Sequence, residues 1–309
     1  MSLVINTNVA SLNAQRSLAA SGAELKTAME RLSSGKKINS AADDAAGFAI
    51  AERMTAQIRG LNMATKNATD GLSMIAAVEN ATNDVTDMLH RIRELAVQAA
   101  NDTNSSTDRG YLQKEVDSLL NEINRVASQT VYNGAEVLDG SRSGTANAQQ
   151  IQVGTDSGQS ISFEIDAVDT DTLGLSLDSF TARNGSTPAA IEDMSTEDPA
   201  TSATLTTGQK ISVETAADAS IALGKVTAAI ELVAGGRAEL GAVSNRLEYT
   251  ISNLMNVAEY TTAARSRIED ADFAAESARL AKAQVLQQTG TAMLAQANAS
   301  QQLALSLFR

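Results

Sequence analysis

The sequence predicts a mainly α-helical fold: a long antiparallel helical bundle or coiled-coil rod formed by both chain ends, with a small β-hairpin region in the middle. Apolar residues recur at heptad spacing near both termini, and the middle of the chain lacks this spacing. Only two prolines, Pro188 and Pro199, interrupt 309 residues, so most of the chain is free to form unbroken helix. Aromatic residues make up only 3%, which favours helix-on-helix packing by small aliphatic side chains.

Each end of the chain carries a stripe of small and apolar residues on one helix face. Such a stripe requires a partner helix to cover it. Because these side chains bury little area, we expect roughly the first 40 and last 40 residues to be largely disordered in the monomer and to fold on packing against other copies. The N-terminal stripe is Ala14, Leu18, Ser21, Leu25, Ala28 and Leu32, and the C-terminal stripe is Leu280, Ala283, Leu286, Gly290, Met293 and Ala297.

Between the stripes, the spacing predicts two further helices in the first half of the chain. A polar, glycine-containing break at 33–47 is followed by one very long helix from Ala45 to about Ala100, and Asp43 and Asp44 are typical of a helix start. A turn at 101–110 precedes a helix that begins near Thr107 and Asp108. The long helix carries an uninterrupted apolar stripe, namely Ile75, Val78, Thr82, Val85, Leu89, Ile92, Ala96 and Ala99.

The middle of the chain changes character. Asn-Gly and Asp-Gly turn signals within 131–140, and apolar alternation at 151–153 and 161–165, predict short β-hairpins. Residues 176–215 are rich in Ser and Thr and show no sustained period, so we expect a variable surface segment that projects outward and offers glycan sites. Helix resumes near Ala216 with a stripe that runs from Val226 to Ala258 and includes Arg237 and Ser244.

Composition excludes several classes of function. The net charge of −13 disfavours nucleic acid and anionic membranes as partners. The absence of cysteine excludes a disulfide framework and a thiol nucleophile. No run of 18 apolar residues and no secretory signal peptide is visible, so we expect a cytoplasmic location unless a dedicated machine exports the chain.

The sequence offers no catalytic constellation. The only histidine, His90, follows Leu89 in a predicted helix and has no second histidine with which to bind a metal. The adjacent carboxylates Asp43 and Asp44 point in different directions along a helix, so a helix start explains them better than acid–base chemistry. We therefore expect a protein that is not an enzyme, with no catalytic residue, no metal site and no cofactor.

Six segments resemble the signature motifs of bacterial flagellin, in the same order along the chain. The resemblance covers about residues 1–175 and 216–309. The chain departs from the family pattern in its last residues, which lack a proline often found there. The segments are INTNVASLNAQRSL (5–18), RLSSGKKINSAADDAAGFAIAERM (31–54), IRELAVQAAN (92–101), LNEINRVASQTVYNG (120–134), ARSRIEDADFAAE (264–276) and AQVLQQTGTAMLAQAN (283–298).

The resemblance implies an organisation and a set of partners. Residues 1–42 and 270–309 would form an inner coiled-coil domain, residues 43–175 and 216–269 a helical rod domain with β-hairpins, and residues 176–215 the variable segment. The chain would self-assemble into the extracellular flagellar filament used for motility, after export in unfolded form by the flagellar type III apparatus. Its partners would be other copies of itself, an export chaperone, the filament cap and the hook-junction proteins.

The resemblance also implies a recognition site for Toll-like receptor 5. By motif, Arg91, Leu95 and Glu115 would form the contact. Arg91 and Leu95 are four residues apart on a helix, and an arginine beside an apolar anchor is typical of an interface hot spot. The alternative is that this face packs only against the next subunit of the filament.

Two other functions stay open on the sequence alone. One is a hook–filament junction protein, which resembles flagellin at both ends. The other is a flagellin-like adhesin or secreted enzyme that acts through residues 176–215, although this segment contains no histidine.

Overall fold

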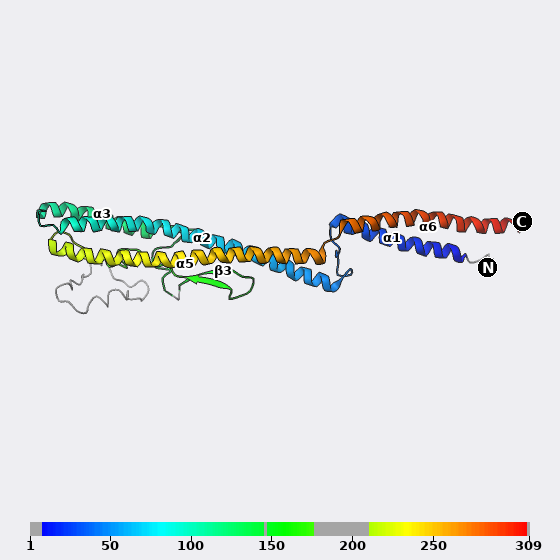
Figure 1. Cartoon of the computed structure of the whole chain (residues 1–309), viewed down its shortest axis with the longest axis horizontal. Helices are drawn as coiled ribbons and strands as arrows, with labels where there is room; N and C mark the ends of the chain where they lie inside the picture. Colours follow the sequence, from blue (N-terminus) through cyan, green and yellow to red (C-terminus); the bar gives the residue numbers. More distant parts are fainter. Residues whose placement is uncertain (1–7, 145–146, 176–209, 308–309) are drawn as a thin grey trace. The chain divides into compact units, whose positions relative to one another are not determined.

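The computed structural model describes residues 8–144, 147–175 and 210–307 of the chain, with side chains described up to residue 299. The chain folds as two compact units: a terminal unit, Met1–Gly60 with Asn256–Arg309, and a central unit, Leu61–Met255. The helices are α1 (Val9–Ser34), α2 (Ala45–Ala99), α3 (Ser106–Gln129), α5 (Ala216–Glu269) and α6 (Phe273–Leu307) (Figure 1). Four short strands are β1 (Val131–Tyr132), β2 (Ala135–Glu136), β3 (Gln149–Gln152) and β4 (Ser160–Phe163).

The predicted stripe of the long helix is the centre of the central unit. All eight members, from Ile75 to Ala99, are at most 4% exposed. The seven apolar members, all but Thr82, belong to one apolar cluster with residues of α3 and α5, among them Val116, Ile123 and Leu247. The mainly helical fold and the long helix are therefore confirmed, because a strict alternation of three and four residues keeps one face of α2 turned towards its neighbours.

A capping box starts α3. The Ser105 hydroxyl accepts a hydrogen bond from the backbone N–H of Asp108 (3.2 Å), and the Asp108 carboxylate accepts one from the backbone N–H of Ser105 (3.1 Å). The hydroxyl and backbone N–H of Ser105 hold the pKa of Asp108 below its ordinary value. The helix begins at Ser106, one residue before the expected start.

Two hairpins follow α3, as predicted. Asn133 and Gly134 both have positive φ, 51° and 79°, which is the geometry of the two-residue turn between β1 and β2. In the second hairpin Ile151 of β3 lies opposite Ile161 of β4. Gly71 of α2 lets this hairpin pack closely, since a Cβ at Gly71 would lie 2.1 Å from Cδ1 of Ile151.

The end of the predicted variable segment is part of the core, which corrects its boundary. Ile211 and Val213 are 2% and 0% exposed. The Gln113 side chain of α3 donates to the carbonyl of Ile211 and accepts from the N–H of Val213. Two alternating apolar residues are too few to stand out as a period, so the expectation of an outward projection is wrong for 210–215. Residues 176–209 lie outside the described part.

Helix α5 contains a stretch that is long and apolar enough, by length and composition alone, to cross a membrane. The sequence has no strictly apolar run of 18 residues, and this stretch includes a few polar ones. Its buried residues Val226, Val233, Leu240 and Leu247 belong to the same cluster as the α2 stripe. Part of the apolar surface of α5 therefore packs in the core of the central unit.

The backbone N–H of Ile211 donates to the carbonyl of Leu175 (2.9 Å), so the segment between them leaves and rejoins the core at adjacent points. We predict that replacing 176–209 with a short Gly/Ser linker leaves the urea midpoint of unfolding unchanged. Extending the replacement to 215 removes Ile211 and Val213 and should lower stability by about 2–5 kcal/mol. Equal stability of the two variants would contradict the corrected boundary.

The lowered pKa of Asp108 gives the α3 cap a pH dependence. A carboxyl with a lowered folded-state pKa stabilises above its unfolded pKa, and the contribution is lost as pH falls through the folded value. We predict that Ser105→Ala lowers stability by about 0.5–2 kcal/mol at neutral pH. The difference from the native chain should shrink in acid, below the unfolded pKa of Asp, which is about 4. Urea unfolding at both pH values measures it, and a difference that does not change with pH would refute the cap's role.

Candidate assembly and recognition surfaces

Helices α1 and α6 lie side by side and antiparallel within the terminal unit (Figure 1). Polar contacts fix their register at both ends. Near the chain termini the Asn8 amide donates to the carbonyl of Ala297 (3.0 Å), and the Ser11 hydroxyl donates to the side chain of Asn298 (3.1 Å). At the other end Arg31 of α1 lies 3.7 Å from the carboxylate of Glu276. Polar pairs at defined positions of a helix seam typically set its register.

Small residues let the two helices approach closely. A Cβ at Gly290 would lie 3.2 Å from Cδ1 of Leu18, so glycine leaves room for the leucine at this crossing. The pair buries little area, since Ser11 and Ala28 are the only buried residues of α1. Both helices are nevertheless formed within a single chain, so the structure does not show the disorder that we expected of these ends in the monomer.

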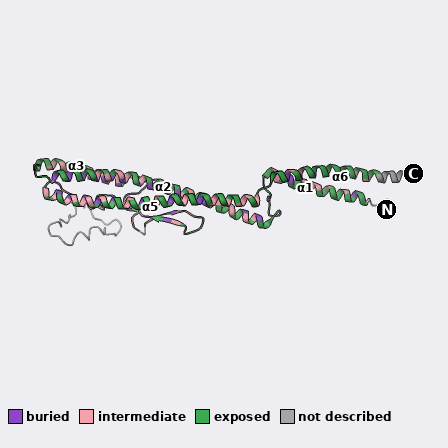
Figure 2. Cartoon of the chain, viewed as in Figure 1, coloured by how far each residue is buried: buried purple, intermediate pink, exposed green. Residues whose placement is uncertain are grey.

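The N-terminal stripe faces α6 as a whole: Ala28 is buried, and Ala14, Leu18, Ser21, Leu25 and Leu32 are half-buried. Figure 2 shows both half-buried and exposed residues along α6. The C-terminal stripe is divided between covered and exposed positions. Its members Leu280, Ala283, Gly290 and Ala297 are buried or half-buried, whereas Leu286 and Met293 are 41% and 61% exposed. Our expectation was wrong at these two positions: Leu294, not Met293, is half-buried, and neighbouring residues of a helix point about 100° apart, so Leu286 and Met293 fall outside the covered face.

Glu276 is the one charged residue among the described residues that is classed as buried, with 5% exposure. Its carboxylate lies 3.7 Å from Arg31 and 3.2 Å from Arg279. A buried carboxylate loses its hydration, so these two guanidinium groups compensate it where α6 meets α1.

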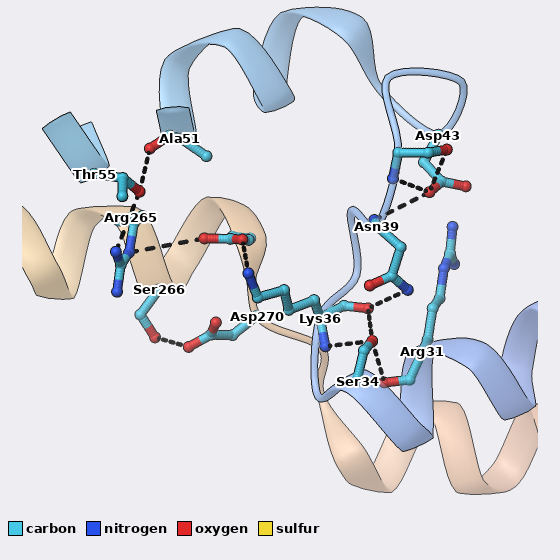
Figure 3. Close-up of polar contacts among 12 residues, drawn as sticks. Arg31, Ser34, Lys36, Asn39, Asp43, Ala51, Thr55, Arg265, Ser266 and Asp270 are labelled. Carbon is cyan, nitrogen blue, oxygen red and sulfur yellow. Dashed lines mark hydrogen bonds and ion pairs between the residues drawn. The ribbon is translucent and has the colours of Figure 1, made fainter. Parts of the chain in front are cut away.

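The connection between α1 and α2 is bonded to the connection between α5 and α6 (Figure 3). Lys36 and Asp270 form an isolated antiparallel bridge, and the N–H of Ala271 donates to the carbonyl of Gly35 (2.9 Å). Gly35 has φ +70°, the left-handed conformation that ends many helices. The two breaks in the helices therefore hold each other in place.

Side chains reinforce this junction, as Figure 3 shows. The Glu269 carboxylate pairs with Lys36 and lies 3.7 Å from Arg265. Arg265 also donates to the hydroxyl of Thr55 on α2 (3.2 Å). The Glu269 carboxylate of α5 thus connects Lys36, which follows α1, with Arg265 near the end of α5.

Asp43 and Asp44 organise the start of α2. Backbone N–H groups of Ser40 and Asn39 donate to Asp43 and lower its pKa. Asp44 accepts from the N–H groups of Ala46 and Gly47 in the first turn of α2. These bonds support the helix-start interpretation of the pair over an acid–base one.

The residues implied as a receptor site lie on α2 and α3 in the central unit. Arg91 donates two hydrogen bonds to Glu115 (2.9 and 2.7 Å) and one to Glu94 (3.0 Å). Leu95, however, is 1% exposed and belongs to the apolar cluster. Leu95 is therefore not accessible as the apolar anchor beside Arg91, since it lies next to Ala96 of the α2 stripe and packs in the same core.

No metal-binding arrangement is found in the described part of the chain. No group of three or more His, Asp or Glu side chains there could hold an ion. His90 is exposed on α2.

The chain matches two flagellin family descriptions. The bacterial flagellin N-terminal helical region matches residues 5–143, and the bacterial flagellin C-terminal helical region matches residues 223–308. Flagellin A of Vibrio anguillarum is 36% identical, with both chains covered in full. A flagellin of Halalkalibacterium halodurans is 38% identical and covers 99% of this chain and 100% of its own length.

One solved structure shows a similar fold. A flagellar hook-associated protein from Vibrio parahaemolyticus aligns with a TM-score of 0.54 over 74% of this chain and 100% of its own, at 13% identity, which shows the fold alone. The Bacillus cereus flagellin aligns over 61% of this chain and 88% of its own, with a TM-score of 0.44 and 28% identity.

Glu276 provides a test of the α1–α6 register. We predict that Glu276→Gln destabilises this pair by about 1–3 kcal/mol, because Arg31 and Arg279 lose their shared carboxylate. Hydrogen exchange should quicken in α1 and α6 and stay unchanged in α3. Glu24→Gln, at an exposed position of α1, is the matched control. Unchanged exchange in both variants would show that the carboxylate contributes nothing.

Proposed function

Because the chain belongs to the bacterial flagellins, we propose that it self-assembles through its terminal helices into the extracellular filament of the bacterial flagellum. Flagellins are a structural protein family, and their members form that filament. Full-length identity of 36–38% to flagellins of two organisms supports the same role here. In this proposal residues 1–42 and 270–309 form the inner domain, and the remaining helices form the rod.

The observation that carries the proposal is the apolar surface left after α1 and α6 have paired. Val9, Leu12 and Met29 on α1, and Val285, Leu286 and Met293 on α6, are all at least 41% exposed. Large apolar side chains that stay exposed on both helices of a pair are positions that a further copy of the chain could cover. Other copies of the chain would cover them, and each added copy would supply the buried area that one α1–α6 pair lacks.

The alternatives have weaker support. The hook-associated neighbour is only 13% identical, so its likeness concerns the fold. The relatives that span the whole chain are flagellins, which favours a filament subunit over a junction protein. An adhesin or enzyme would have to act through residues 176–209, which the structure does not describe.

Export in unfolded form by the flagellar type III apparatus is part of the proposal. The absence of cysteine and the presence of only two prolines suit this route, because no disulfide can form early and slow prolyl isomerisation is limited. A chaperone, the filament cap and the hook-junction proteins would be its partners during and after export.

Seeded growth tests the filament proposal. We predict that the native chain extends filament seeds and that Leu286→Lys abolishes extension, since a charge would enter the buried contact between copies. Leu286 is 41% exposed, so the lysine can reach solvent and the monomer should keep its helix content by circular dichroism. Leu286→Met is the matched control and should assemble normally. Filaments of Leu286→Lys equal to native in length and number would contradict the proposed surface.

We also propose recognition of the monomer by Toll-like receptor 5 through the exposed pair Arg91 and Glu115. We predict that Arg91→Ala lowers receptor activation roughly tenfold, as loss of an interface arginine typically does. Arg93→Ala, also exposed on α2, is the control in the same reporter assay. Leu95→Ala should instead lower stability by about 2–5 kcal/mol, because it leaves a cavity in the core. Unchanged signalling by Arg91→Ala would exclude the site.

A further inference from the structure

The described methionines of the chain differ widely in solvent exposure, and Met54 and Met88 are half-buried. Met29, Met63, Met255 and Met293 are 51–61% exposed, whereas Met74 is 7% exposed. Methionine commonly fills gaps in cores, where its sulfur is shielded from reagents. Two of the exposed thioethers, Met29 on α1 and Met293 on α6, belong to the helix pair of the terminal unit.

We propose that Met29 and Met293 are two modification sites for peroxide, and that their conversion to sulfoxides weakens assembly of the chain. The claim of reactivity with peroxide follows from the exposure of the two methionine side chains. The claim of weakened assembly rests on the proposed function, in which α1 and α6 pack against other copies of the chain.

The chemistry needs only the thioether and a peroxide. The sulfur donates an electron pair to one oxygen of hydrogen peroxide, and an S–O bond forms as the O–O bond breaks. The transferred oxygen gives up its proton, and the second oxygen takes up one proton and leaves as water, so the sulfur is oxidised and the peroxide is reduced. The product is a polar, chiral side chain that sulfoxide reductases can convert back to methionine.

The position of Met293 explains why its oxidation would matter. Met293 and Leu286 are seven residues apart, which places them on the same face of α6, and both are exposed in the monomer. If this face packs against another copy, the sulfoxide oxygen must lose its water without a defined partner. Met29 is exposed on α1 among the apolar residues left uncovered by α6.

The register in which α1 and α6 pair places Met29 and Met293 far apart along the two helices. Ser11 contacts Asn298 and Arg31 pairs with Glu276, so Met293 lies beside the first half of α1 and Met29 near its end. Oxidation would therefore place a polar group at two separate points of the helix pair. Every subunit added to a filament would carry both groups.

Three chains test the proposal: native, Met29→Leu/Met293→Leu, and the matched control Met63→Leu/Met255→Leu. Leucine keeps the volume and apolar character of methionine and removes the sulfur. Each monomer is treated with hydrogen peroxide, quenched with catalase, analysed by mass spectrometry at each methionine, and added to filament seeds.

We expect Met29 and Met293 to oxidise faster than Met74. Treated native chain and treated Met63→Leu/Met255→Leu should then extend seeds about tenfold less than untreated chain, because each buried sulfoxide disfavours the contact. Treated Met29→Leu/Met293→Leu should extend them normally. Sulfoxide reductases should restore growth of the treated native chain.

Three results would overturn the proposal. The first is oxidation of Met29 and Met293 no faster than that of Met74. The second is normal seed extension by native chain oxidised at both residues, and the third is equal loss of growth in treated Met29→Leu/Met293→Leu. Failure of the untreated native chain to extend seeds would instead refute the proposed function, and the mass spectra would still decide the reactivity of the two sulfur atoms.

Discussion

The packing of the α2 stripe is the interaction on which the central unit depends. Each of its eight residues from Ile75 to Ala99 is buried, so α2 presents one continuous face to the rest of the unit. Helices α3 and α5 contribute to the same cluster, and the hairpin of β3 and β4 packs against α2 through Ile151 at Gly71. A charge introduced into this stripe would lose its hydration and disturb every element that packs there.

The terminal unit is held together differently. Small residues such as Gly290 bring α1 and α6 close, but few side chains become fully buried. Because little apolar area is buried, polar contacts stabilise the pair: those of Asn8 and Ser11 at one end, and the ion pair of Glu276 with Arg31 at the other. Hydrogen bonds and ion pairs select one register, whereas a uniform seam of small residues would tolerate several.

Periodic features of the fold could be predicted from the sequence, because a helix face repeats in a regular way. The stripe of α2, the Asn133-Gly134 turn and the start of α5 near Ala216 were all predicted, since each depends on local spacing or local backbone preference. The helix-start role of Asp43 and Asp44 was predicted for the same reason, whereas Ser105, the residue that caps α3, was not.

Features set by neighbours distant in sequence could not be predicted. The burial of Leu95 depends on where the α2 stripe meets the cluster, and the burial of Ile211 and Val213 depends on Gln113 of α3. The exposure of Leu286 and Met293 depends on which side of α6 packs against α1. The junction of Lys36 with Glu269 joins residues more than two hundred positions apart, and no local signal reveals it.

The hydrogen bond between Leu175 and Ile211 has a consequence for how this chain can change over evolutionary time. Where a segment's two ends are adjacent, lengthening it changes the entropy of loop closure only slowly, by about 0.6 kcal/mol for each doubling of its length. A gene insertion at this point could add anything from a few residues to an independently folding domain without moving the flanking core. The position is a natural graft site, at which a foreign peptide could be displayed once on every copy of the chain.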